Sequence, residues 1–205
     1  MKDSFNEDYY ENGVQLGISG YTNYRWMPQL TIPMCEKIIE YLCLKKNKKI
    51  LDFGCAKGFI VKAFHDLGYD CCGTDISDYA ISQAPDEIKS RLFLWDNLDL
   101  EQTFQVIIAK DVFEHIEPDI LSGILQKLRP TCDKLFCVVP LGDGEKYIIP
   151  EYENDVTHVI REDREWWINF FEENEMKVQY FSYLIGGIKD NWSHYPKGNG
   201  CFILS

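Results

Sequence analysis

The chain has 205 residues, with 33 acidic against 21 basic side chains and a formal net charge of −12 at pH 7. Hydrophobic residues make up 45% of it, which excludes a disordered chain and suffices for one domain with a buried core. The acidic balance disfavours binding to duplex DNA or RNA, because phosphate contacts need clustered Lys and Arg. We therefore expect no nucleic-acid partner.

Membrane, export and disulfide signals are weak in this sequence. No stretch approaches the roughly 20 apolar residues that span a bilayer, and the first residues lack the apolar segment of a signal peptide. The eight cysteines include no C-x-x-C pair, and most lie in apolar runs such as 135–139. We expect reduced, buried thiols rather than disulfides or a zinc site. These features predict a cytoplasmic protein with no membrane partner and no bound metal.

The order of expected elements is an N-terminal arm followed by alternating strands and helices. Residues 1–28 are rich in Tyr, Asn and Gly and lack a period, so we expect an irregular arm with one short helix at most. Apolar residues at helical spacing predict helices at 30–44, 59–67, 77–84, 118–128 and 163–173. Apolar runs predict strands at 50–53, 70–74, 91–95, 104–109 and 134–139.

Strands separated by helices predict a doubly wound, Rossmann-like α/β fold with a mostly parallel sheet. The last two extended segments, 176–184 and 201–204, are joined by a loop without a helix. They predict an antiparallel hairpin at the C-terminal edge of a seven-stranded sheet. We expect an N-terminal arm at 1–28 that acts as a lid, and one domain at 29–205.

The loop after the first expected strand carries Gly54, Ala56 and Gly58. Glycine at this place lets a ligand approach the backbone at the carboxyl end of a parallel sheet. Dinucleotide enzymes have G-x-G-x-x-G here and P-loop proteins have G-x-x-x-x-G-K-[ST], and the sequence fits neither. A nicotinamide-dependent oxidoreductase is therefore disfavoured.

The run Asp52-x-Gly54-x-Ala56-x-Gly58 resembles motif I of the class I S-adenosylmethionine-dependent methyltransferases, acidic-x-G-x-G-x-G, with Ala56 in place of the middle glycine. Further motifs resemble this family in the same order. They are Asp75-Ile76 after the second strand, Asp96-Asn97 after the third, the run 104–116, and Leu128-Arg129-Pro130. The run 104–116 is similar to F-D-x-[VI]-x-x-x-x-[VL]-x-E-H-[VI] of the ubiquinone-pathway O-methyltransferase branch, with Gln105 in place of Asp. The likeness covers about residues 49–140.

This resemblance implies S-adenosyl-L-methionine as cofactor, with S-adenosyl-L-homocysteine as product. The Asp75 carboxylate is then expected to accept hydrogen bonds from the ribose hydroxyls. Asp52 either contacts the cofactor or holds the loop. The aromatic arm either folds over the cofactor, with Arg25 on the methionyl carboxylate, or packs on the core. The cofactor-binding residues expected are Asp52, Gly54, Gly58, Asp75, Ile76, Asp96, Asn97, Lys110 and Arg25.

Three residues are candidates for a catalytic base. His115 follows Glu114 at the expected mouth of the sheet, where a near-neutral pKa suits proton removal from a hydroxyl. The Glu-His pair has packing as its alternative role. His158 follows the fifth strand, where the family's substrate-binding loop falls, and competes with His115. Asp111 is a further candidate, with a helix cap or a solvated face as the alternative.

We expect methyl transfer to a small-molecule acceptor, with oxygen as the favoured nucleophile. N-methylation of a small molecule or protein is an alternative, as is a non-catalytic protein that binds S-adenosylmethionine. The sequence lacks the [DN]-P-P-[FYW] motif of amino-methylating DNA enzymes and the Pro-Cys pair of cytosine C5 enzymes. Neither the acceptor nor the oligomeric state follows from the sequence.

Overall fold

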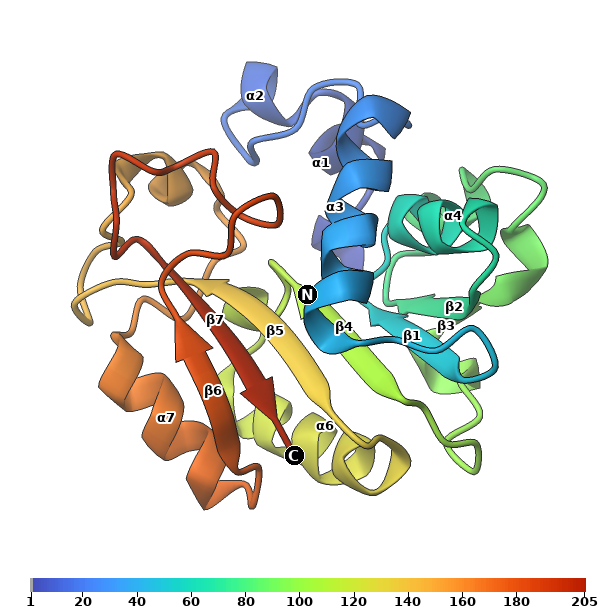
Figure 1. Ribbon diagram of the computed structural model, residues 1–205. Coiled ribbons are helices and arrows are strands. Elements are labelled where there is room, and N and C mark those ends of the chain that lie inside the picture. The colour runs from blue at the N-terminus through green and yellow to red at the C-terminus, as the bar shows by residue number, and fades with distance from the viewer. Residues whose placement is uncertain (1) are drawn as a thin grey trace. The chain divides into compact units, whose positions relative to one another are not determined.

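The structure is a computed structural model that describes residues 2–205 (Figure 1). The chain divides into two compact units, one ending at Asp99 and the other beginning at Leu100. Its strands form a seven-stranded mixed sheet, ordered β3-β2-β1 in the first unit and β4-β5-β7-β6 in the second. This confirms the predicted α/β class. The division into an arm at 1–28 and a domain at 29–205 stays a prediction.

Three parallel strands organise the first unit: β1 (Lys49–Phe53), β2 (Asp70–Asp75) and β3 (Leu92–Leu94). β1 pairs with β2 from Lys49 opposite Asp70 to Phe53 opposite Thr74. Beyond β1, the amides of Gly54 and Cys55 both donate to the carbonyl of Thr74, at 2.8 and 3.0 Å. Because the strands run in one direction, the loop after β1 and the residues after β2 meet at the same sheet edge.

The arm is more helical than the sequence predicts, because it contains two short α-helices and a 3-10 turn where one short helix at most is expected. The helices of the first unit are η1 (Lys2–Ser4), α1 (Glu7–Glu11), α2 (Gly13–Leu16), α3 (Pro28–Leu42), α4 (Phe59–Asp66) and α5 (Asp78–Ser82), with 3-10 turns η2 (Lys89–Arg91) and η3 (Trp95–Asn97). The hydroxyl of Ser77 accepts from the amide of Ala80 and caps α5, as its position predicts. Helix α3 packs beside α4 (Figure 1).

The second unit contains β4 (Val106–Lys110), β5 (Leu135–Pro140), β6 (Val178–Ser182) and β7 (Asn199–Leu204). β4 and β5 are parallel, whereas β7 is antiparallel to both β5 and β6. The expected C-terminal antiparallel pair is present, with its last strand on the inner side. The residues of β7 are nearly all buried and those of β6 are half-exposed, so the more apolar strand lies next to the buried β5.

Two longer helices pack in the second unit, α6 (Pro118–Leu128) and α7 (Arg164–Glu173), with short turns η4 (Phe113–His115), η5 (Arg129–Thr131) and η6 (Pro150–Asn154). Pro118 occupies the first turn of α6, where its missing N–H costs nothing. Helix α7 lies along β6 (Figure 1) and buries Trp167 and Phe171 completely. Among residues 2–205 no helix is long and apolar enough to cross a membrane.

Candidate active site

The loop between β1 and α4 adopts a left-handed backbone at three positions. Gly54 and Gly58 each have φ of 77°, and Ala56 has φ of 49°. A left-handed residue with a Cβ costs roughly 1–2 kcal/mol, which explains why motif I of the resembled family has glycine at the position of Ala56. A Cβ on Gly58 would in addition lie 2.6 Å from Cδ1 of Leu92. The glycines are therefore required by backbone shape and close packing.

Asp75, the last residue of β2, holds this loop. Its Oδ2 accepts from the amide of Ala56 at 2.7 Å, and its Oδ1 accepts from the amide of Ser77 at 2.8 Å. Burial raises the pKa of Asp75, an effect that these hydrogen bonds oppose in part. Each carboxylate oxygen has more than one acceptor site, so Asp75 can order the loop and also accept from a ribose hydroxyl.

The other residues of the first unit that are predicted to contact the cofactor lie in or just after β1, β2 and β3. Ile76 is exposed beside Asp75, and Asp96 with Asn97 forms the exposed turn η3 directly after β3. β3 pairs with β2 so that Leu94 lies opposite Asp75. Asp52 lies inside β1 and is 2% exposed. Its burial favours the alternative in which Asp52 supports the loop from within.

The N-terminal arm packs on the loop. Tyr9 and Tyr10 of α1 are buried together with Ala80, and Ala56 of the loop packs against this cluster. The hydroxyl of Ser77 donates to the carbonyl of Phe5 at 2.5 Å. Aromatic rings of the arm thus cover the position at which motif I departs from the family pattern.

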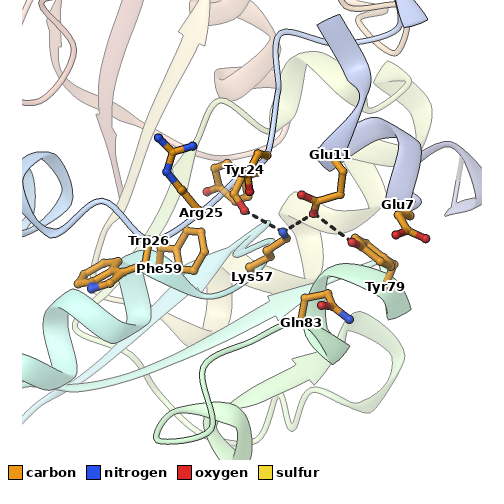
Figure 2. A pocket seen from close by; sticks show the side chains of 10 residues that line it. Glu7, Glu11, Tyr24, Arg25, Trp26, Lys57, Phe59, Tyr79 and Gln83 are labelled. Carbon is orange, nitrogen blue, oxygen red and sulfur yellow. Dashed lines mark hydrogen bonds and ion pairs between the residues drawn. The ribbon is translucent and has the colours of Figure 1, made fainter. Parts of the chain in front are cut away.

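A cavity of about 450 Å³ lies between the arm and the start of α4 and α5 (Figure 2). At its centre the Lys57 ammonium pairs with the Glu11 carboxylate and donates to the carbonyl of Tyr24 at 2.7 Å. The Tyr79 hydroxyl donates to the same Glu11 oxygen at 3.0 Å. Arg25 lines the cavity but points away from this group (Figure 2). Sequence reasoning missed Lys57, Glu11 and Tyr79, which only the folded arm brings together.

In the second unit Asp111 lies between two lysines. The Lys110 ammonium is 2.6 Å from its Oδ2, and the Lys189 ammonium donates to both of its oxygens at 2.8 Å. Burial raises the pKa of Asp111, but the two ammonium groups outweigh it and hold that pKa well below its usual range. A carboxylate kept ionised in this way is a weak base. Lys189, distant in sequence, carries no signal that sequence reasoning detects.

The two histidines predicted as candidate bases come together. His115 ends η4 and His158 follows η6, and their ring centroids lie 4.5 Å apart. Nδ1 of His115 is 2.7 Å from Oγ1 of Thr157, and Nδ1 of His158 is 2.8 Å from the carbonyl of Tyr152. Burial lowers the pKa of both rings, that of His115 to about 4. Both are therefore neutral at pH 7.

Glu114 lies next to this pair and is 1% exposed. Its main-chain carbonyl accepts from the amides of Val159 and Ile160, at 2.8 and 3.2 Å. Burial raises the pKa of its carboxyl well above the usual range. Among the described residues its Oε2 has no hydrogen-bond partner. One nitrogen or oxygen atom from each of Glu114, His115 and His158 lies within 4.8 Å of the other two, so these residues are able to hold a metal ion.

Residues 27–183 match a family of proteins described as a methyltransferase domain. The chain belongs to this family. The match extends from the arm past β6 and includes the loop after β1, Asp75 and the Glu-His pair. It confirms the family resemblance that the ordered motifs indicate.

Comparison with known proteins places the methyltransferase among distant relatives. It is 30% identical over 109 residues to the mitochondrial ubiquinone biosynthesis O-methyltransferase of Schizosaccharomyces pombe, a match over 47% of this chain and 39% of that protein. The chain thus matches less than half the length of that relative.

Solved structures share its fold. An S-adenosylmethionine-dependent methyltransferase from Archaeoglobus fulgidus has a TM-score of 0.62 at 13% identity, covering 86% of this chain and 96% of that one. Magnesium protoporphyrin IX methyltransferase from Synechocystis, with bound S-adenosylhomocysteine, has a TM-score of 0.62 at 13% identity, covering 99% and 96%. These matches confirm the predicted Rossmann-like α/β fold.

Proposed function

We propose that this methyltransferase transfers the methyl group of S-adenosyl-L-methionine to an oxygen atom of a small hydroxylated molecule and releases S-adenosyl-L-homocysteine. The observation that carries this proposal is the Asp75 carboxylate at the end of β2, hydrogen-bonded to the amide of Ala56 in the glycine-containing loop. This arrangement offers one acidic residue for ribose hydroxyls beside a loop whose left-handed glycines turn the backbone at the end of the sheet.

The proposed cofactor contacts follow from these positions. Asp75 accepts from the ribose, Ile76 packs on the adenine, and Asp96 with Asn97 binds the adenine amino group. Asp52 acts by supporting the loop, in which Gly54 and Gly58 supply the left-handed backbone that the turn requires. Arg25 is exposed and lines the cavity beside the loop, where a guanidinium suits the methionyl carboxylate. Lys110, at the end of β4, completes the set implied by the family resemblance.

Oxygen is the proposed nucleophile for two reasons. The run 104–116 resembles that of the ubiquinone-pathway enzymes, and the relative from Schizosaccharomyces pombe is named an O-methyltransferase. In addition, His115 and His158 are neutral at pH 7 because burial lowers their pKa values, and a neutral imidazole accepts a proton from a hydroxyl. The ionised, doubly paired Asp111 is the weakest of the three candidate bases. Methyl transfer itself requires alignment of donor and acceptor and exclusion of water.

Calorimetry separates the cofactor classes. Titration of the protein with S-adenosylhomocysteine is expected to give binding near one ligand per chain, and titration with NAD is expected to give none. Tight NAD binding without adenosylhomocysteine binding would overturn the cofactor assignment.

A transfer assay with methyl-labelled S-adenosylmethionine tests the acceptor. Matched pairs of small aromatic compounds, one with hydroxyl groups and the other with amines at the same positions, are supplied at equal concentration. Label on the hydroxyl member alone supports O-methylation, and label on the amine member alone points to N-methylation. Cofactor binding with no transfer to either kind of acceptor, nor to protein, supports a non-catalytic binding protein.

A further inference from the structure

Glu114, His115 and His158 converge from two segments of the second unit, the η4 turn and the stretch after η6. One side-chain nitrogen or oxygen of each lies within 4.8 Å of those of the other two. The ring centroids of the two histidines are 4.5 Å apart. The cluster thus combines two imidazoles and one carboxylate, a donor set common in metal sites.

The hydrogen bonds of the two rings fix which nitrogen carries the proton. Nδ1 of His158 faces the carbonyl of Tyr152, which can only accept, so Nδ1 is protonated. Nδ1 of His115 faces Oγ1 of Thr157, which uses its own proton to donate to Asp155 at 2.5 Å. The threonine oxygen therefore accepts from Nδ1 of His115. In both rings Nε2 is the unprotonated nitrogen.

These partners are the kind that orient metal-bound histidines. A ligating imidazole commonly donates its other N–H to a backbone carbonyl or toward a carboxylate, which sets its tautomer and ring orientation. His158 has the carbonyl of Tyr152 in this role, and His115 has the relay through Thr157 to Asp155. Both rings are thus oriented as neutral imidazoles whose Nε2 can coordinate a metal ion.

One oxygen of the Glu114 carboxylate lacks the partner that its burial demands. Glu114 is 1% exposed, and within residues 2–205 no group hydrogen-bonds to its Oε2. The nearby amides of Val159 and Ile160 donate to its main-chain carbonyl instead. A buried oxygen without a partner costs about 1–3 kcal/mol, and more when it is charged. A cation bound to this oxygen removes that cost.

Asp111 is a poor additional ligand, although it is close in sequence. Its two oxygens already accept from Lys110 and Lys189, and a metal ion would have to break those ion pairs. The donor set available is therefore two nitrogens and one oxygen.

We propose that Glu114, His115 and His158 form a binding site for a divalent transition-metal ion, held by Nε2 of each histidine and by the Glu114 carboxylate. Imidazole nitrogens favour zinc and its first-row neighbours, whereas magnesium and calcium prefer oxygen-only ligands. Three protein ligands leave at least one position for water or another oxygen ligand. This replaces the expectation, drawn from the sequence, that the protein binds no metal. A bound metal takes the Nε2 lone pair of each imidazole, so the base role proposed above for His115 and His158 applies to the metal-free protein.

Zinc titration of the metal-stripped protein, without cofactor or acceptor, tests this site. We expect one Zn²⁺ per chain with a Kd in the micromolar range or tighter, and a higher Tm on binding. His158→Gln and Glu114→Gln are each expected to weaken binding by at least 100-fold. Thr157→Val keeps all three ligands but removes the acceptor for His115, and should weaken binding about 10- to 100-fold. Thr157→Val also keeps the test informative if a ligand variant fails to fold.

Matched controls exclude other zinc ligands. His194→Gln replaces an exposed histidine of the same unit, and Cys43→Ser removes the exposed thiol. Both variants are expected to bind zinc as the parent protein does. Substitution with Co²⁺ should give an absorption spectrum without thiolate charge-transfer bands. Absence of zinc binding, equal binding by parent and His158→Gln proteins, or thiolate bands with cobalt would each overturn the proposal. Because no methyl transfer is measured, its failure is distinguishable from failure of the proposed function.

Discussion

The Asp75 side chain links the geometry of the glycine loop to the chemistry proposed for it. One oxygen is bound to the amide of Ala56 and the other to the amide of Ser77. A neutral amide in the same place has one acceptor oxygen instead of two. Loss of the carboxylate therefore weakens both the order of the loop and its hydrogen bonds to a ribose.

We predict that Asp75→Asn weakens S-adenosylhomocysteine binding at least tenfold, about 1.4 kcal/mol. Isothermal calorimetry at a temperature where both proteins are folded measures the change. Asp70→Asn is the control, because Asp70 lies at the opposite end of the same strand, exposed and paired with Arg91. Equal loss of affinity in both variants would contradict a specific role for Asp75.

The positions of several proposed site residues were predictable because their signal is local. Gly54, Gly58, Asp75 and the cap Ser77 follow strand ends that apolar runs reveal. Lys57 and Lys189 were not predictable, since their partners Glu11 and Asp111 are far away in the chain. The meaning of a charged residue depends on what faces it, and only folding determines that.

At the scale of elements, two glycines differ in whether backbone conformation and packing require them. Gly58 precedes α4 with a left-handed backbone and side-chain carbons of Leu92 and Ile88 within 3 Å of its would-be Cβ. Gly123 lies inside α6 with nothing within 4 Å of that position. The first position requires glycine, and the second only tolerates it.

We therefore predict that Gly58→Ala lowers the free energy of unfolding by about 2–3 kcal/mol, combining left-handed strain with crowding. Gly123→Ala is expected to raise it by about 0.5–1 kcal/mol, because alanine favours a helix interior over glycine. Denaturant unfolding of the two variants, measured in parallel, gives the sign of the change in the free energy of unfolding for each. A stabilised Gly58→Ala protein would show that the loop is not constrained in this way.

The arm is attached to the loop by Lys57, whose side chain is 9% exposed. We predict that Lys57→Met destabilises the protein by about 1–3 kcal/mol, because it removes a charged donor from Glu11 and from the carbonyl of Tyr24. It should also speed proteolytic cleavage within residues 17–26.

Lys37→Met provides the comparison for this variant. Lys37 pairs with Glu40 on the exposed face of α3, where solvent screens the pair so that it adds little to stability. Thermal denaturation and timed proteolysis should leave this variant close to the parent. Similar behaviour of both variants would mean that Lys57 does not hold the arm.

At the scale of the whole molecule, the exposure of the cysteines indicates how well the core excludes solvent. All eight are thiols rather than disulfide-bonded, and Cys43 alone among them is exposed. Burial raises the pKa of Cys72 to about 11 and that of Cys132 to about 12. Thiolate is the reactive form of cysteine. Burial therefore slows the reaction of these thiols in two ways, because it blocks access of the reagent and lowers the fraction of thiolate.

We predict that a thiol reagent such as Ellman's modifies one cysteine quickly in the native protein and all eight after unfolding. Cys43→Ser should abolish the fast phase of modification. After unfolding, the number of cysteines modified in this variant should fall by one at most. Two or more fast thiols in the native protein would indicate that the core opens more readily than this packing implies. The assay requires only absorbance measurements in buffer and in denaturant.

The sequence alone determined the fold class, the chain order of its elements and the motifs at the ends of β1, β2 and β3. These depend on local periodicity, caps and glycine positions, which neighbouring residues encode. Only the tertiary structure decided that β7 lies between β5 and β6, and that the arm is partly helical and packed on the loop. Only it brought His158 beside Glu114 and His115. Strand pairing and ligand clusters join residues distant in the chain, and their formation depends on burial that no short segment specifies.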